Sequence, residues 1–332
     1  MRVFLLAVAL CLSAAAAQAA DPLVLQLKWF ADAQFAGYLV AQDKGFYRKA
    51  GLDVTIKPGG PDIDPSKVLA SGEADVAVDW MPSALAARDR GAPLVNIAQI
   101  FQRSGLQLTC RRDKGVRNPA DLEGRTLAVW FAGNEFPFLA WMAKLGLRTG
   151  GDHPDLKVLE QGAGVELLTE NRADCISTMS YNEYWQVIDT GMRPAQLKVF
   201  RYEKEGVATL EDGLYATEAK LADAASADRL ARFLRASAEG WRFAIAPEHA
   251  AETAAAVMGQ AAPGRLEAAK ERRMLGEVAK LVAGAGHGIG YLDPAAYERT
   301  VEVLLAGTVN PVIRRKPDGA WTRAVWAKAF AR

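Results

Sequence analysis

Aromatic side chains and carboxylate or amide side chains follow the predicted β-strands of this chain. The first set is Trp29, Phe30, Asp32, Gln34, Asp79, Trp80, Pro82 and Ser83, and the second is Trp130, Phe131, Asn134, Glu135, Thr178, Ser180, Tyr181, Asn182 and Glu183. Open α/β sheets bind ligands outside the carboxyl ends of their strands. Aromatic faces suit a flat ring, and carboxylates and amides accept hydrogen bonds from its N–H groups. Because neither set contains a cluster of arginine or lysine, the residues favour a heteroaromatic ligand with an amino group over an anion.

A repeated motif indicates how these residues come together. Trp29-Phe30-Ala31 recurs 101 residues later as Trp130-Phe131-Ala132. Ala74-Asp75 recurs 99 residues later as Ala173-Asp174. Two repeats at nearly the same spacing predict two related lobes, with the functional site in the cleft between them.

Each of these side chains also has a purely structural interpretation. A tryptophan at the end of a strand can belong to the core, and strand alternation sends Trp29 and Phe30 to opposite sides. Glu135 and Glu183 follow apolar strands, where an unpaired carboxylate is costly to bury. We therefore expect these two carboxylates to be either solvated or part of the site.

The composition argues against some classes of partner. The chain has 332 residues, enough for two domains with a large buried core. Its 40 basic and 39 acidic residues give a formal net charge of +1, and the basic residues are scattered. Such a balance gives no electrostatic basis for binding nucleic acid or an anionic membrane surface, so we expect neither partner.

The N-terminus has the pattern of a secretory signal peptide. Arg2 precedes the apolar run Val3–Leu12, and Ala17-Gln18-Ala19 fits a small-x-small cleavage site. The apolar run is far shorter than the ~20 residues that a membrane-spanning helix needs. Cys11 raises the alternative of a lipoprotein, but the residue before it is too large for that motif. We predict a signal peptide over residues 1–20, cleaved near its last alanines, and export to the periplasm.

Two cysteines remain after the signal peptide. Cys110 and Cys175 have neither CxxC nor Cys/His metal spacing, and both lie in apolar, strand-like runs. We expect buried free thiols at both positions. A disulfide formed after export stays open as an alternative, because sequence does not place the two Cα atoms. No other motif indicates a metal or a cofactor, so we predict neither.

Strand and helix patterns alternate along the rest of the chain. The sequence predicts strands over residues 23–27, 52–56, 74–78, 106–110, 126–130, 156–159, 173–177 and 214–216. It predicts helices over residues 35–50, 64–71, 82–90, 222–245, 250–258, 263–283 and 294–305. This alternation is typical of a parallel or mixed sheet covered on both faces. We expect the strand at 106–110 to enter the second lobe and the strand at 214–216 to return to the first.

Longer motifs around these residues resemble a known family. They read WFADAQFAGYLVAQDKGFYRKAGLDVTIKPGGPDIDP, LASGEADVAVDWMPSALAARDRGAPLVNIAQIFQRSG, VWFAGNEF and MSYNEYWQV. They resemble the periplasmic substrate-binding proteins of the thiamine-pyrimidine-precursor type, a family shared with fungal thiamine pyrimidine synthases. The resemblance spans about residues 23–305. It implies a type II periplasmic-binding-protein fold, in which two α/β lobes are joined by two crossing strands and close on a ligand between them.

The resemblance also implies roles for individual residues. We assign residues 21–105 and 214–332 to the first lobe and residues 106–213 to the second. By position, Trp29 and Trp80 are candidates for stacking on the ligand ring, and Glu183 is the first candidate for its amino group. The full set of predicted binding residues is Trp29, Phe30, Gln34, Trp80, Asn134, Glu135, Tyr181, Asn182 and Glu183.

The family includes an enzymatic branch, which requires a separate comparison. The fungal synthases consume an active-site histidine and carry a cysteine-rich run that binds iron. This chain has no such run, and we expect His153, His249 and His287 at surface or turn positions. It also has no GxSxG, Walker A or HExxH pattern. We therefore predict a binding protein and no catalysis.

Three functions and several ligands stay open. The favoured function is a monomeric receptor that delivers a pyrimidine precursor of thiamine to an inner-membrane ABC permease and its ATPase. Riboflavin, a sulfonate and nitrate are alternative ligands of the same fold. A synthase-like enzyme and a periplasmic sensor module are the alternative functions.

Overall fold

A computed structural model describes residues 19–261, 264–283, 286–306 and 311–331. The predicted signal peptide, with Cys11, lies outside the described residues except for its last two positions. Within these ranges, no helix is both long enough and apolar enough to cross a membrane.

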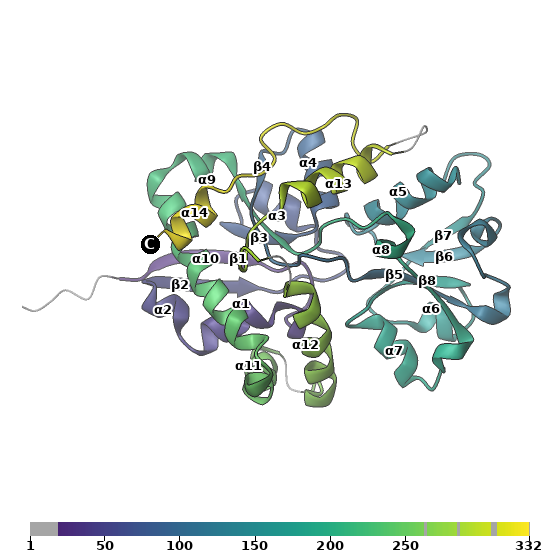
Figure 1. Cartoon of the computed structure of the whole chain (residues 1–332), viewed down its shortest axis with the longest axis horizontal. Coiled ribbons are helices and arrows are strands. Elements are labelled where there is room, and N and C mark those ends of the chain that lie inside the picture. Colours follow the sequence, from purple (N-terminus) through teal and green to yellow (C-terminus); the bar gives the residue numbers. More distant parts are fainter. Residues whose placement is uncertain (1–18, 262–263, 284–285, 307–310, 332) are drawn as a thin grey trace, which may run out of the picture.

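The described chain forms two five-stranded sheets, one in each lobe (Figure 1). The first sheet has the order β2-β1-β3-β10-β4, with β1 at Asp21–Gln26, β2 at Leu52–Lys57, β3 at Val76–Asp79, β4 at Leu94–Gln99 and β10 at Gly213–Thr217. The second has the order β7-β6-β8-β5-β9, with β5 at Leu106–Arg111, β6 at Thr126–Val129, β7 at Lys157–Glu160, β8 at Cys175–Met179 and β9 at Leu197–Arg201. Both sheets are therefore of mixed α/β type, as the sequence predicts.

The two sheets have the same internal topology. In each sheet, three parallel strands occupy one side: β2, β1 and β3 in the first, and β7, β6 and β8 in the second. The fourth strand, β10 or β5, runs antiparallel to both of its neighbours. Each of these strands follows a segment that passes between the lobes, residues 206–212 and 100–105 respectively. This confirms the prediction of two α/β lobes joined by two crossing strands, while the boundaries assigned to the lobes stay a prediction.

The second sequence repeat has a structural cause. Asp75 precedes β3, and its carboxylate accepts a hydrogen bond from the backbone N–H of Val24 in β1 at 2.8 Å. Asp174 precedes β8, and its carboxylate accepts one from the N–H of Thr126 in β6 at 2.9 Å. Equivalent aspartates thus connect equivalent pairs of strands in the two lobes: Asp75 connects β3 to β1, and Asp174 connects β8 to β6.

Helices cover both faces of each sheet (Figure 1). Those around the first sheet are α1 (Ala36–Asp43), α2 (Phe46–Lys49), α3 (Pro65–Ala70), α4 (Met81–Asp89), α9 (Glu218–Ala222), α10 (Ala224–Ala244), α11 (Ala250–Gln260), α12 (Ala268–Val282), α13 (Pro294–Leu305) and α14 (Ala324–Phe330). Those around the second are α5 (Phe136–Leu145), α6 (Glu166–Thr169), α7 (Glu183–Asp189) and α8 (Tyr202–Glu205). A short 3-10 helix, η1 (Ala33–Phe35), leads from β1 into α1.

Some elements differ from the sequence prediction. The predicted helix over 35–50 is broken by Gly45, whose φ of 70° ends α1 and starts α2. The strands β4 and β9 and the helices α5, α6, α7, α8 and α14 lie outside the predicted elements. In β4 all six residues are buried although two of them, Asn96 and Gln99, are polar. Their side chains hydrogen-bond to each other at 3.1 Å, which lets polar groups occupy a buried strand that a hydrophobic pattern does not reveal.

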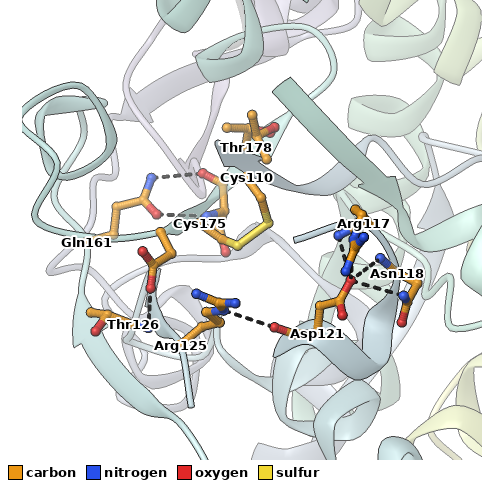
Figure 2. Close-up of a disulfide and its surroundings, with 12 residues drawn as sticks. Cys110, Arg117, Asn118, Asp121, Arg125, Thr126, Gln161, Cys175 and Thr178 are labelled. Atoms are coloured by element: carbon orange, nitrogen blue, oxygen red, sulfur yellow. Dashed lines mark hydrogen bonds and ion pairs between the residues drawn. A yellow bond between two sulfur atoms is a disulfide. The ribbon is translucent and has the colours of Figure 1, made fainter. Parts of the chain in front are cut away.

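Cys110 and Cys175 form a disulfide (Figure 2). The two residues lie opposite each other in the antiparallel pair β5 and β8, and both side chains are fully buried. The expectation of free thiols is therefore wrong. The two cysteines are 65 residues apart in sequence, and their contact depends on strand pairing that neither local run specifies. Buried disulfides are typical of proteins that fold outside the reducing cytosol.

Candidate ligand site between the lobes

A small cavity lies between the lobes and is lined from both sides. Its volume is about 20 Å³, which is room for little more than one water molecule. The lining residues are Lys28, Trp29, Gln34 and Trp80 from the first lobe and Trp130, Asn134, Met179, Tyr181 and Glu183 from the second. A cavity of this size admits an aromatic ring only when the two lobes move apart.

The tryptophans of the repeated motif meet at this cavity. Trp29 follows β1 and Trp130 follows β6, and their ring centroids are 5.9 Å apart in an edge-to-face arrangement. The indole N–H of Trp130 donates to the backbone oxygen of Gly162 at 3.0 Å, which fixes the orientation of that ring. The wall between the lobes is therefore aromatic, as the sequence predicts.

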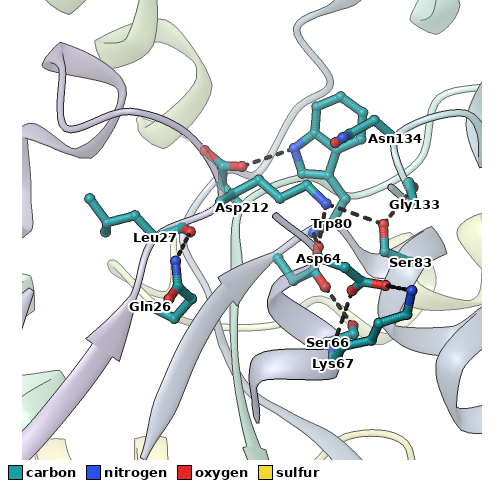
Figure 3. A network of polar contacts seen from close by, with 12 residues as sticks. Gln26, Leu27, Asp64, Ser66, Lys67, Trp80, Ser83, Gly133, Asn134 and Asp212 are labelled. Carbon is teal, nitrogen blue, oxygen red and sulfur yellow. Dashed lines mark hydrogen bonds and ion pairs between the residues drawn. The ribbon is translucent and has the colours of Figure 1, made fainter. Parts of the chain in front are cut away.

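Trp80 is held by a buried aspartate on the crossing segment (Figure 3). One carboxylate oxygen of Asp212 accepts from the indole N–H of Trp80 at 3.0 Å, and the other accepts from the amide of Gln34 at 2.7 Å. Asp212 has a φ of 46°, a left-handed conformation that few residues other than glycine, asparagine and aspartate adopt. The crossing segment thus fixes two side chains that line the cavity.

The basic side chain in the cavity wall is already paired. The ammonium of Lys28 lies 2.7 Å from Asp79, and the two side chains are 2% and 1% exposed. Asp79 also accepts from the hydroxyl of Ser66 at 2.5 Å and from the backbone N–H of Trp80 at 2.7 Å. The ammonium of Lys28 lies 5.6 Å from the centroid of the Trp80 ring. This arrangement orders one wall of the cavity and leaves its cation neutralised.

Glu183 enters the cavity from the second lobe as the first residue of α7. One of its carboxylate oxygens accepts from the N–H of Met179 at 2.9 Å, and the other accepts from the amide of Asn182 at 2.9 Å. Burial raises the pKa of Glu183 to about 7, and the hydrogen bond from Met179 opposes that rise. No ion pair to Glu183 exists among the described residues.

The turn before α5 brings the second lobe against the first. Gly133 has a φ of 93°, and its backbone oxygen accepts from the hydroxyl of Ser83 in α4 at 2.6 Å. A Cβ atom at Gly133 would lie only 2.9 Å from that hydroxyl oxygen, so a glycine suits this close approach. Glu135 does not line the cavity: its carboxylate turns back to accept from the N–H of Gly133 at 2.8 Å.

A wider groove of about 530 Å³ adjoins the cavity and shares Trp29 with it. Phe30 and Asn182, which the sequence placed in the site, line this groove rather than the small cavity. The guanidinium of Arg265 lies 4.0 Å from the centroid of the Phe30 ring. The groove also contains two buried carboxyl groups, of Asp32 and Glu271.

These two carboxyl groups lie side by side. Asp32 accepts from the N–H of Gln34 at 3.0 Å, and Glu271 accepts from the adjacent N–H of Ala33 at 2.9 Å. Burial, followed by the charge of Glu271, raises the pKa of Asp32 well above its usual value. Burial also raises the pKa of Glu271. Together with Glu183, they make the cleft acidic rather than basic.

The acidic character continues into the crossing segment. Burial raises the pKa of Asp212 to about 7, against the opposing effect of its hydrogen bonds from Gln34 and Trp80. Burial raises the pKa of Glu211 to about 8, although Ser104 and the N–H of Gly105 both donate to it. In their ionised form, such carboxyl groups are complemented by a cation or a hydrogen-bond donor rather than by an anion.

Six of the nine residues predicted from the sequence line the small cavity: Trp29, Gln34, Trp80, Asn134, Tyr181 and Glu183. The predicted binding set lacks Lys28, Trp130 and Met179, which also line the cavity, and the supporting Asp212, although Trp130 is among the strand-end residues marked by the sequence. Lys28 directly precedes the tryptophan of the motif, so its position was a usable signal. Asp212 lies in the second crossing segment, and no local pattern marks that residue. Among the described residues, no cluster of histidine, cysteine, aspartate and glutamate could hold a metal ion.

Comparison with known proteins identifies the family to which this chain is similar. The family model described as "NMT1/THI5 like" matches residues 32–251. The formylaminopyrimidine-binding protein of Halalkalibacterium halodurans is 24% identical over 238 residues, which are 69% of this chain and 68% of that protein. The riboflavin-binding protein RibY of Chloroflexus aurantiacus is 25% identical over 292 residues, 85% of this chain and 80% of that one.

A solved structure agrees with the fold. The ligand-binding component of an ABC-type import system from Staphylococcus aureus superimposes with a TM-score of 0.65. The match covers 93% of this chain and 100% of that chain, at 12% sequence identity. At this identity the likeness concerns the fold alone.

Proposed function

The chain belongs to the NMT1/THI5 like family, and on that premise we propose that it is the solute-binding protein of an ABC importer. It binds a small heteroaromatic nutrient that carries an amino group, and the pyrimidine precursor of thiamine is the favoured ligand. The two lobes close over this ligand, and the loaded protein delivers it to an inner-membrane permease and its ATPase.

The choice of ligand depends on one observation: the buried carboxyl group of Glu183 lines the same cavity as three tryptophan rings. Trp29, Trp80 and Trp130 offer flat faces and edges for a ring. Glu183 is acceptor-only when ionised, and when protonated it can both donate and accept. Either form can pair with the N=C–NH2 edge of an aminopyrimidine. A ligand amine would also supply the hydrogen bonds or the positive charge that this acidic cleft lacks.

The small volume of the cavity indicates the order of ligand entry and lobe closure. The cavity of about 20 Å³ cannot hold a ring, so a ligand enters the open protein and the lobes then close on it. The closed form gains contacts from both lobes, and the ligand selects it for that reason. Trp29 and Trp80 act from the first lobe, while Tyr181 and Glu183 act from the second.

The related proteins support this choice and one alternative. The H. halodurans relative carries the name of a formylaminopyrimidine-binding protein, which agrees with an aromatic and acidic cleft. The C. aurantiacus relative is named for riboflavin. The groove of about 530 Å³ beside the cavity favours riboflavin as the second candidate, because a larger ring system could extend into it past Trp29.

Anionic solutes fit this cleft less well. Sulfonate and nitrate require basic side chains or several free N–H groups. The ammonium of Lys28 is 2.7 Å from Asp79 and is neutralised by it. The remaining space is lined by the carboxyl groups of Asp32, Glu183 and Glu271, which would repel an anion when ionised, and by the basic side chains of Arg265 and Lys270 in the groove.

The remaining parts of the proposal concern the whole protein. We propose a monomer without catalytic activity that is exported to the periplasm after removal of residues 1–20. The buried disulfide between Cys110 and Cys175 supports passage through an oxidising compartment. The names of the two long-matching relatives, both of them binding proteins, support a receptor over a synthase.

A thermal-shift panel on the mature protein tests the proposal. The panel contains aminomethyl- and formylaminomethyl-pyrimidines, thiamine, riboflavin, taurine, an alkanesulfonate and nitrate. A ligand at 100 times its Kd adds about 2.7 kcal/mol of stability, which gives a clear rise in Tm. We expect this rise with the pyrimidines. A rise with an anion alone would contradict the proposed ligand class.

A further inference from the structure

Helix α12 lies along the cleft, from its mouth to the crossing segments. Near its start, Glu271 accepts a hydrogen bond from the N–H of Ala33 in the first lobe at 2.9 Å. Near its end, the backbone oxygen of Leu281 accepts from the N–H of Gln102 in a crossing segment at 2.8 Å. Figure 1 shows α12 on the side of the first lobe that faces α7. The helix is thus fixed to the first lobe while it borders the second.

One side chain of α12 reaches across to the second lobe. The guanidinium of Arg273 makes two parallel hydrogen bonds to the carboxylate of Asp189 in α7, at 2.9 and 2.5 Å. The same guanidinium lies 5.0 Å from the centroid of the Trp185 ring, also in α7. A two-pronged ion pair combined with a cation–π contact is stronger and more directional than a simple surface ion pair.

Helix α7, which contains Asp189, also contains Glu183, the carboxylate proposed to bind the ligand. Helix α7 begins at Glu183 and ends at Asp189, a distance of about 9 Å along its axis. Because a short helix is rigid, a displacement of its last residue also displaces its first residue. Any force that holds Asp189 against α12 therefore also holds Glu183 against the first lobe.

We propose that Arg273, Asp189 and Trp185 form a latch that closes the cleft, positions Glu183 and favours ligands small enough to be enclosed. This inference rests on the proposed function, since it assumes that a solute is bound by lobe closure. It adds residues outside the cavity lining that determine affinity and selectivity, because none of the three side chains borders the small cavity.

The latch stabilises the closed form alone. When the lobes separate, Arg273 stays with α12 and Asp189 moves away with α7, so the pair is lost. A contact present in one of two states shifts the equilibrium between them by its full free energy. The two side chains are 33% and 31% exposed, so the effect is moderate and is weakened by salt. We expect a loss of roughly 2- to 5-fold in affinity when the pair is removed.

The same reasoning predicts selectivity. A small pyrimidine needs only a slight separation of the lobes beyond the cavity of about 20 Å³, so the contact between Arg273 and Asp189 is kept. Riboflavin holds the lobes further apart, so the latch contributes little to its binding. Arg273→Ala should therefore reduce the affinity for the pyrimidine and leave the affinity for riboflavin nearly unchanged, whereas Asp189 itself lines the groove proposed for riboflavin.

The test uses four variants of the mature protein. Arg273→Ala and Asp189→Ala each remove the pair, and the double variant Arg273→Asp with Asp189→Arg reverses it. Lys280→Ala is the matched control, because it breaks an ion pair with Glu277 within the same helix. Calorimetry measures the Kd of formylaminomethyl-pyrimidine and of riboflavin at low and at high salt. Small-angle X-ray scattering measures the radius of gyration of each variant without ligand.

The outcomes separate the latch from the proposed ligand. Weaker pyrimidine binding in both alanine variants at low salt, recovery in the reversed pair and no change in Lys280→Ala would support the latch. Equal affinities in Arg273→Ala and Lys280→Ala would overturn it. If no probe binds the wild-type protein, the proposed ligand class is wrong, and the latch is then tested by scattering alone. A larger radius of gyration in Arg273→Ala than in the wild type and in Lys280→Ala supports the latch, and equal radii overturn it.

Discussion

Trp29 and Trp130 meet edge to face between the two lobes, with ring centroids 5.9 Å apart. They occupy equivalent positions after equivalent strands, β1 and β6, in two sheets of the same topology. Their spacing in the sequence, 101 residues, is therefore the length of chain between equivalent points of the two lobes. Both rings line the cavity between the lobes, which places the repeated motif in the proposed binding site.

The buried carboxyl groups predict an unusual dependence of stability on pH. Burial raises the pKa of Glu183 to about 7 from an unfolded value of about 4.5. Between these values the folded state holds a proton that the unfolded state has lost, so the free energy of unfolding falls as pH rises from about 5 to about 8. In Glu183→Gln this fall should be smaller by up to ~3 kcal/mol.

Urea unfolding of both proteins at a series of pH values measures the difference. Glu170→Gln, at an exposed position, serves as the control and should retain the wild-type slope. A Glu183→Gln profile that parallels the wild type would show that Glu183 titrates normally in the folded protein.

The buried ion pair predicts that two lysine substitutions lower the free energy of unfolding by very different amounts. Lys28→Met leaves the carboxylate of Asp79 buried without its cation, which typically costs about 3–5 kcal/mol of stability. Lys67→Met removes a lysine that is 83% exposed and lies 3.7 Å from Asp64, a loss of about 0–1 kcal/mol. Denaturant unfolding of both variants at neutral pH checks this. Similar losses in the two variants would contradict the role of Lys28 as a buried partner.

The disulfide predicts that stability depends on redox conditions. It joins residues 65 apart, and closing a loop of that length contributes up to ~4 kcal/mol. Cys110→Ser with Cys175→Ser should lower the free energy of unfolding by an amount of this order. The wild type in reducing buffer should show a similar loss once the bond is broken. Equal stability of the oxidised wild type and the double variant would show that the bond adds nothing.

Much of the fold could be predicted from local patterns. The alternation of strands and helices, the motif at Trp29 and its repeat at Trp130 were sufficient to predict two α/β lobes. The pair Asp64-Pro65 predicted the start of α3, where the Asp64 carboxylate accepts from the N–H of Lys67. These features depend on residues that are neighbours in sequence, which explains why they can be read without a structure.

The features that were missed depend on distant contacts. Asp212 supports the cavity lining because Gln34 and Trp80, more than 130 residues away, donate to its carboxylate. The disulfide depends on the pairing of β5 with β8. Lys28 and Asp79 are both charged residues that a hydrophobic pattern would place at the surface, and each is buried only because it neutralises the other. In all three cases the position of the side chain depends on a partner that is distant in sequence.

Calorimetric titration of an aminomethyl-pyrimidine into the wild-type protein and into Glu183→Gln tests the central claim most directly. Glutamine keeps the size of the side chain and can still accept from the N–H of Met179, so the fold should persist. We predict micromolar or tighter binding to the wild type and a loss of about 10-fold or more in the variant, since a hydrogen bond to a charged group contributes about 1.5–3 kcal/mol. Equal affinity in the two proteins would remove Glu183 from the binding site and contradict the proposed recognition of the amino group.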